Sequence, residues 1–248
     1  IIMSKSIKVK NKLNVIFNNL GKPSCNKYLE ELNQDSLFLE SINIMINTND
    51  IFKKRRFENI YEFSVYRNFL YGIIRDLKPK IVVETGVLHG LTSAWILKAL
   101  KDNNNGKLIS VDLPRRDWDK YFKGIEFGDG GEAEYEIQDK VPGWAIPENL
   151  KNRWELFLGP SQEHLPSICT KEESIDLFIH DSDHSYETMN FECSLVQKYH
   201  PKSTMVIDDY YVNDMAFDFS KKTGRNIFEI GDIDDKLKEC KGCAFLTN

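Results

Sequence analysis

The sequence predicts an α/β protein built on a doubly wound, mostly parallel sheet of seven strands. Strand and helix patterns alternate from residue 80 onward, which is typical of a sheet covered by helices on both faces. Most of the strand segments are short, continuous apolar runs, as expected when both faces of a strand are buried. With 248 residues and 41% hydrophobic content, the chain can form one sizeable core. We expect a main domain over residues 61–248.

A helical appendage is predicted over residues 1–60, because apolar positions between residues 7 and 50 have helical spacing and no strand alternation. Two roles are open for it: covering a cleft of the main domain, or pairing subunits into a homo-oligomer. Residues 61–77 form a stronger helical pattern, which Pro79 ends because the residue before a proline disfavours helix.

The expected sheet elements follow in order along the rest of the chain. Strands are predicted at 80–84, 107–112, 154–158, 175–179, 204–207, 226–230 and 243–247, with helices at 90–101, 161–169 and 185–199. The last two strands are joined by a charged stretch too short for a comfortable crossover helix, so we expect an antiparallel C-terminal hairpin.

The segment 113–152 interrupts this alternation and is too long for an ordinary loop. Its large aromatic residues suit a lid or substrate-recognition insert, and a packed surface excursion is equally consistent with the pattern.

Charge and hydropathy exclude several classes of protein. The net charge of −5 and the pI near 5.6 argue against a nucleic-acid binder, which would carry a basic stripe. No apolar stretch approaches the roughly 20 residues that cross a bilayer, and the N-terminus lacks the apolar core of a signal peptide. We therefore expect no membrane partner and a cytoplasmic location.

A glycine-bearing turn, Glu84 to Thr92, joins the first strand to the following helix. Gly86 and Gly90 allow close approach to free backbone N–H groups at the helix N-terminus, which suits a nucleotide-like cofactor. The spacing differs from the G-x-G-x-x-G of dehydrogenases, and no Gly-Lys-Ser/Thr follows, so a triphosphate loop is excluded. Asp112, at the end of the next strand, is placed to bind the hydroxyls of a ribose. Taken singly, Glu84 or Asp112 could instead be helix caps.

Three acids end two neighbouring strands of the predicted sheet: Asp181 after one, and Asp208 with Asp209 after the other. In an open α/β sheet such carboxylates point into one crevice, where they would bind a hard cation such as Mg²⁺, Mn²⁺ or Ca²⁺. His184 lies three residues past Asp181, where its imidazole could act as a general base near neutral pH. A helix-capping role is the alternative for this histidine.

These residues resemble the class I S-adenosylmethionine-dependent methyltransferases, and among them the metal-dependent O-methyltransferases related to catechol O-methyltransferase. The resemblance implies a Rossmann-like methyltransferase fold and S-adenosylmethionine as cofactor. Residues 84–92 are similar to the family's first motif, 109–112 to its ribose-binding strand end, and 159–166 to its adenine-lining segment. It implies cofactor contacts from Glu84, Thr85, Gly86, Gly90, Thr92, Asp112, Ser161 and Gln162, and metal ligation by Asp181, Asp208 and Asp209.

The chain departs from the catechol enzymes at Asp209, where they place Asn, and at His184, where they place Lys. The acid pair and the D-x-x-H spacing resemble the sugar O-methyltransferases of macrolide biosynthesis. That branch implies a saccharide or related natural-product hydroxyl as acceptor, with His184 as base and Asp181 beside it in catalysis. Two alternatives stay open: a metal enzyme like the cephalosporin hydroxylases, which share a similar motif, and a non-catalytic cofactor-binding protein on the same fold.

Overall fold

The computed structural model describes residues 2–48, 64–114, 117, 120, 140–231 and 242–248. Its helices are α1 (Ile2–Asn19), α2 (Ser24–Gln34), α3 (Ser36–Thr48), α6 (Val65–Leu77), α7 (Leu91–Asp102), α10 (Ser161–Lys171), α11 (Tyr186–Tyr199) and α12 (Met215–Thr223), with short 3₁₀ turns η2 (Glu148–Arg153) and η3 (Tyr210–Val212). Its strands are β1 (Ile81–Thr85), β2 (Lys107–Asp112), β3 (Trp154–Leu158), β4 (Leu177–His180), β5 (Thr204–Asp208), β6 (Asn226–Gly231) and β7 (Gly242–Thr247).

The strands form one sheet in the order β3-β2-β1-β4-β5-β7-β6. Strands β1 to β5 pair in parallel, while β7 is antiparallel to both β5 and β6. The predicted fold class, including the antiparallel C-terminal strands, is therefore confirmed. The order reverses direction at β1, so the crevice between β1 and β4 is the topological switch point where α/β sheets bind ligands.

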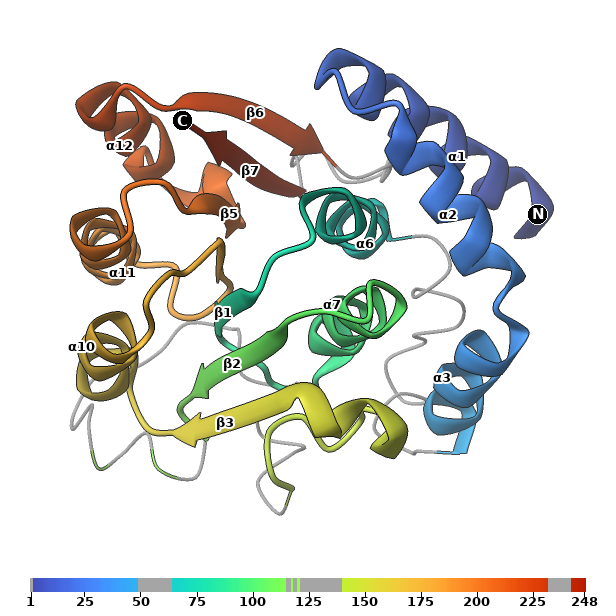
Figure 1. The fold of residues 1–248 in the computed structure, drawn as a ribbon, viewed down its shortest axis with the longest axis horizontal. Coiled ribbons are helices and arrows are strands. Elements are labelled where there is room, and N and C mark those ends of the chain that lie inside the picture. The colour runs from blue at the N-terminus through green and yellow to red at the C-terminus, as the bar shows by residue number, and fades with distance from the viewer. Residues whose placement is uncertain (1, 49–63, 115–116, 118–119, 121–139, 232–241) are drawn as a thin grey trace.

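Both faces of the sheet are buried, which explains the continuous apolar runs in the sequence. Val82 belongs to a core shared with α6 and α7, while its neighbour Val83 belongs to a second core under α10, α11 and α12. Figure 1 shows these two groups of helices on opposite sides of the sheet. Alternate side chains of one strand thus enter different cores, because successive residues point to opposite faces.

Helix α6 begins and ends where local chemistry requires. Ser64 is its N-cap and accepts a hydrogen bond from the backbone N–H of Arg67 at 3.1 Å. Lys78 takes the left-handed conformation at its C-terminus, directly before Pro79. Residues 61–63, where the predicted helix starts, lie outside the described residues.

The N-terminal helices pack against α6 and α7 and extend the first core (Figure 1). Phe17 stacks on Phe69 with ring centroids 5.7 Å apart. The buried ammonium of Lys98 on α7 lies 2.8 Å from the carboxylate of Asp35, between α2 and α3. The boundary expected near residue 60 falls outside the described residues, and subunit pairing through these helices stays a prediction. No helix among the described residues is long and apolar enough to cross a membrane.

Candidate active site

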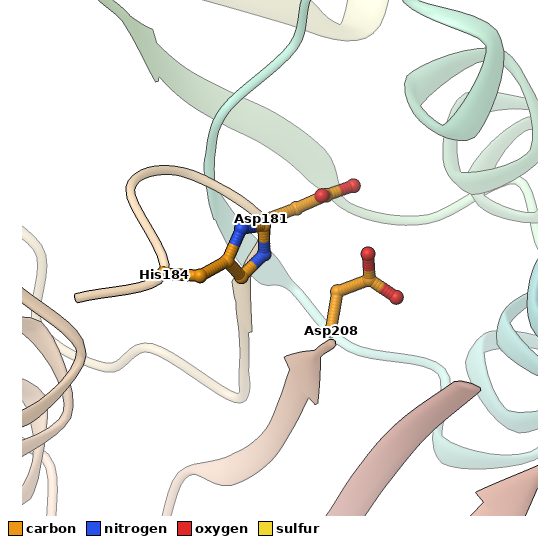
Figure 2. A group of neighbouring side chains, drawn as sticks. All are labelled: Asp181, His184 and Asp208. Atoms are coloured by element: carbon orange, nitrogen blue, oxygen red, sulfur yellow. The ribbon is translucent and has the colours of Figure 1, made fainter. Parts of the chain in front are cut away.

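Two acids and a histidine meet where strands β4 and β5 end (Figure 2). Asp181 directly follows β4, and Asp208 is the last residue of β5. His180 pairs with Ile207 in the sheet, so the two acids occupy corresponding positions on adjacent strands. Asp181, His184 and Asp208 each offer one ligand atom, and these atoms all lie within 4.8 Å of one another. The crevice expected from the sequence therefore gathers these three side chains.

Asp209, the third predicted metal ligand, lies beside this group but is not one of its members. Its backbone is left-handed, with φ of 46°, which is uncommon for a residue other than glycine. One carboxylate oxygen, Oδ1, accepts a hydrogen bond from the hydroxyl of Tyr211 at 2.8 Å. Ligation by Asp209 stays a prediction.

The acids at this site suit a divalent cation. Burial, followed by the charge of Asp208, raises the pKa of Asp181 well above its usual range. Burial and the charge of Asp209 likewise raise the pKa of Asp208 from 3.8 to about 7. Close, buried carboxylates repel one another unless a proton or a cation compensates them. Carboxylate oxygens are the ligands that Mg²⁺, Mn²⁺ and Ca²⁺ prefer.

Tyr66, on α6, is a second indication that this site binds a ligand. Its hydroxyl is buried and has no hydrogen-bond partner among the described residues. Burial, then the charges of Asp181 and Asp208, raise its pKa well above 10. The tyrosine therefore lies near both acids, although nothing in the sequence apart from its helical position points to it.

The pKa shifts predict how the metal-free protein responds to pH. Because folding raises the pKa of Asp208 from 3.8 to about 7, its contribution to stability is complete below pH 4 and lost as the pH rises through 7. The Tm of the metal-free protein should therefore fall between pH 5 and pH 8, by roughly 5–10 °C. Added Mg²⁺ should raise the Tm more at pH 8, where the carboxylates are ionised. Thermal scans at both pH values, with EDTA or Mg²⁺, test this; equal responses to Mg²⁺ would contradict it.

The loop that carries His184 is held at both ends. Ser185 caps α11 by accepting a hydrogen bond from the backbone N–H of Thr188 at 3.3 Å. Asp183 accepts hydrogen bonds from the hydroxyls of both residues and so shapes the turn. Asn213 donates to the backbone carbonyl of His184 at 2.9 Å. The capping residue is therefore Ser185, which leaves the imidazole of His184 for the site.

The imidazole of His184 is kept in its neutral form. Burial, and then the proximity of His180, lower its pKa below the usual 6.5. Its Nε2 atom is buried and has no partner among the described residues. A neutral imidazole with a free ring nitrogen can accept a proton near neutral pH.

The glycine turn lies against the end of β4. Gly86 and Gly90 have φ of 84° and 87°, values that other residues rarely adopt. A Cβ atom on Gly86 would lie 1.8 Å from the backbone carbonyl oxygen of Asp181. The turn predicted to bind the cofactor and the strand end that carries an acid are thus in direct contact.

A Gly86→Ala variant should lose most of its cofactor binding and much of its stability. The positive φ alone costs on the order of 1–3 kcal/mol, and the clash with Asp181 adds to it. Gly224→Ala is a matched control, since φ is 74° there but nothing lies within 4 Å of the added Cβ. Calorimetric titration of S-adenosylmethionine and thermal scans compare the two. Similar losses in both variants would refute the close contact at Gly86.

Asp112 supports the glycine turn through hydrogen bonds to its backbone. Its Oδ2 atom accepts hydrogen bonds from the backbone N–H groups of Val87 at 2.6 Å and Leu88 at 2.9 Å. The sequence offers two roles for Asp112, ribose binding or helix capping, and these two bonds to the turn just before α7 are closer to the second. Ribose binding by Asp112 stays a prediction.

The other predicted cofactor residues divide into two groups. Glu84 and Thr85 are fully buried beneath the turn. Glu84 accepts hydrogen bonds from the hydroxyls of Ser93 and Ser110, both at 2.8 Å, and so supports the turn from below. Thr92 begins α7 after Leu91, while Ser161 and Gln162 begin α10. These helix N-termini follow the ends of β1 and β3 at the same edge of the sheet as Asp112.

The end of the long insert packs on the glycine turn. The backbone N–H of Gly143 donates to the carbonyl of Leu88, and that of Ala145 donates to the carbonyl of His89. The indole of Trp144 donates to Nδ1 of His89 at 3.2 Å. Residues 115–116, 118–119 and 121–139 lie outside the described residues, so a mobile lid stays a prediction.

Comparisons with known proteins agree with this architecture. A family model described as a methyltransferase domain matches residues 83–210. An O-methyltransferase from Bacillus cereus, solved with S-adenosylhomocysteine, superposes with a TM-score of 0.50 at 15% identity, covering 87% of this chain and 92% of that one. TomG from Streptomyces achromogenes, an O-methyltransferase of tomaymycin synthesis solved with S-adenosylmethionine, gives 0.45 at 14% identity, covering 72% and 77%. A search of curated proteins found no match.

The family match covers more than half of the chain and includes the glycine turn, Asp112 and the acids that end β4 and β5. The Bacillus cereus structure has the same overall fold. The chain belongs to the methyltransferase-domain family and has the fold of the class I S-adenosylmethionine-dependent methyltransferases.

Proposed function

We propose that this protein is a divalent-metal-dependent O-methyltransferase that moves a methyl group from S-adenosylmethionine to a hydroxyl of a saccharide or related natural product. The observation that carries the proposal is the contact between the glycine turn and the end of β4, because a donor held by that turn would lie beside Asp181, His184 and Asp208. Both neighbouring structures named above are O-methyltransferases according to their descriptions.

In this proposal the residues divide the reaction between them. The glycine turn and Asp112 hold the donor, while Asp181 and Asp208, with Asp209, would hold the cation. A bound divalent cation would lower the pKa of the acceptor hydroxyl. His184 takes the hydroxyl proton, and the acceptor oxygen attacks the methyl carbon. The carbon–sulfur bond breaks with its electron pair left on sulfur, which yields S-adenosylhomocysteine and the methyl ether. Holding both reactants in line supplies much of the rate enhancement.

The saccharide acceptor rests on the resemblance of Asp209 and His184 to the macrolide-sugar enzymes. An oxygenase like the cephalosporin hydroxylases is less well supported, because iron oxygenases usually use two histidines and one carboxylate. The group found among the described residues has one histidine and two carboxylates.

Titration of the purified protein with S-adenosylmethionine, S-adenosylhomocysteine and Mg²⁺, singly and together, tests the proposal. We expect both cofactor forms to bind, and methyl transfer to a panel of glycosides to stop with EDTA and resume with excess Mg²⁺. Failure to bind either cofactor form would contradict the proposal and favour a different metal enzyme on this fold. Methyl transfer at the full rate in EDTA would contradict the metal dependence of the proposed reaction.

A further inference from the structure

Glu192, on α11, is a fully buried carboxylate that no motif in the sequence singles out. It accepts hydrogen bonds from the hydroxyl of Thr85 at 2.6 Å and from that of Ser182 at 2.9 Å, and its Oε2 lies 2.7 Å from Nδ1 of His180. Thr85 ends the strand before the glycine turn, and Ser182 lies in the loop before His184. One side chain thus connects the cofactor strand, the acid-bearing strand and the loop of the proposed base.

The hydrogen-bonding chemistry of this cluster specifies where His180 carries its proton. Burial opposes ionisation of Glu192, but hydrogen bonds from His180, Ser161 and Thr85 favour the carboxylate, and its pKa is lowered. An ionised carboxylate can only accept hydrogen bonds, so Nδ1 of His180 must donate. The second ring nitrogen, Nε2, is buried and has no partner among the described residues. A proton there would lack an acceptor, which makes the tautomer protonated at Nδ1 the favoured one.

His180 in turn lies against the proposed base. The rings of His180 and His184 are 5.5 Å apart between centroids and nearly perpendicular, at 88°. The side chain of His180 is completely buried, so its ring restricts the orientations that the ring of His184 can take. A ring nitrogen of His184 also lies within 4.8 Å of carboxylate oxygens of Asp181 and Asp208.

We propose that Glu192 is a positioning residue that fixes the tautomer and ring orientation of His180 and, through His180, the orientation of His184. The role of His184 as base rests on the proposed function, whereas the tautomer of His180 does not. Removing such supporting hydrogen bonds from a metal or catalytic site typically costs 10- to 100-fold in activity. These hydrogen bonds also explain why an acid is buried in a helix that the sequence presents as an ordinary covering helix.

Two substitutions separate positioning from charge. Glu192→Gln can keep its amide oxygen toward His180 and its amide nitrogen toward Ser182, whose hydroxyl can turn to accept. It should retain most of the kcat. Glu192→Leu fills similar space without hydrogen bonds and should lower kcat by roughly 10- to 100-fold. Glu187→Leu, at an exposed position in the first turn of the same helix, is the control and should behave as the parent.

Nitrogen-15 NMR of the histidine rings reads the tautomer directly in the unmodified protein. We expect His180 to show a proton on Nδ1 at pH 7.5 in the parent and in Glu192→Gln. In Glu192→Leu the signals should shift toward the Nε2–H tautomer. A parent His180 protonated only at Nε2 would overturn the proposal, even if the leucine variant failed to fold.

Kinetics give the remaining decisive outcomes. A Glu192→Leu variant with the parental kcat and an intact fold would overturn the proposed positioning role. A Glu192→Gln variant as impaired as Glu192→Leu would overturn it too, because the negative charge of Glu192, and not its hydrogen bonds, would then determine the rate. If the parent transfers no methyl group, the proposed function fails. The NMR result then still decides whether Glu192 sets the tautomer of His180.

Discussion

An Asp208→Ala variant is expected to lose methyl transfer to below detection while it keeps its fold and its affinity for S-adenosylmethionine. Asp208 is half-buried at the end of β5, and its side chain shares a hydrogen bond with that of Asp181. Alanine removes one carboxylate from the proposed cation site but leaves the glycine turn and Asp112 untouched. Because it also removes one of two repelling acids, the metal-free variant should be at least as stable as the parent above pH 7.

The measurements for this variant are turnover, Mg²⁺ affinity by calorimetry and Tm. Glu155→Ala serves as control, since Glu155 is an exposed acid on the edge strand β3, with its carboxylate 3.9 Å from the ammonium of Lys107. We expect Mg²⁺ affinity to fall sharply in Asp208→Ala and to remain at the parental value in Glu155→Ala. Turnover at the parental rate in Asp208→Ala would refute a metal role for this carboxylate.

A His184→Ala variant is expected to lower kcat by roughly 10²- to 10⁴-fold, the range typical of a lost general base. The KM for S-adenosylmethionine should change little, since the predicted cofactor residues lie on β1, β2, α7, α10 and the glycine turn, and not on the loop of His184. His184→Asn should be similarly impaired, because an amide fills part of the site but cannot take the proton.

The dependence of rate on pH separates a base from a packing residue. Because burial lowers the pKa of His184, the parent should be fully active at pH 7 and lose activity only at lower pH. Steady-state kinetics between pH 5 and pH 9 test this. Parental rates in His184→Ala across that range would exclude the histidine as base, whereas loss of folding would be visible in the Tm.

Strand positions and the site acids could be predicted because their causes are local. A short apolar run such as 204–207 predicts a strand buried on both faces, and an acid that follows it must lie at the strand's carboxyl end. The structure extends that strand only by Asp208. The turn from Glu84 to Gly90 could be predicted as well, because glycines are placed where the turn needs a positive φ.

Features that depend on distant contacts could not be predicted in this way. The position of β7 between β5 and β6 follows from sheet pairing, and helix α12 was not expected at all. Glu192 looks like a solvent-facing helix residue until the fold brings Thr85 and His180 to it, 107 and 12 residues away in the sequence. Likewise, Asp112 braces the glycine turn only because β1 and β2 are adjacent.

The central claim is that the acids at the ends of β4 and β5 hold a cation next to the donor methyl group. Paramagnetic relaxation measures this directly: S-adenosylmethionine labelled with carbon-13 in its methyl group is bound to the protein, and Mn²⁺ is added. The account predicts strong broadening of the methyl signal, reversed by excess Mg²⁺ and absent in Asp208→Ala. A methyl signal that stays sharp while both Mn²⁺ and cofactor are bound would contradict it.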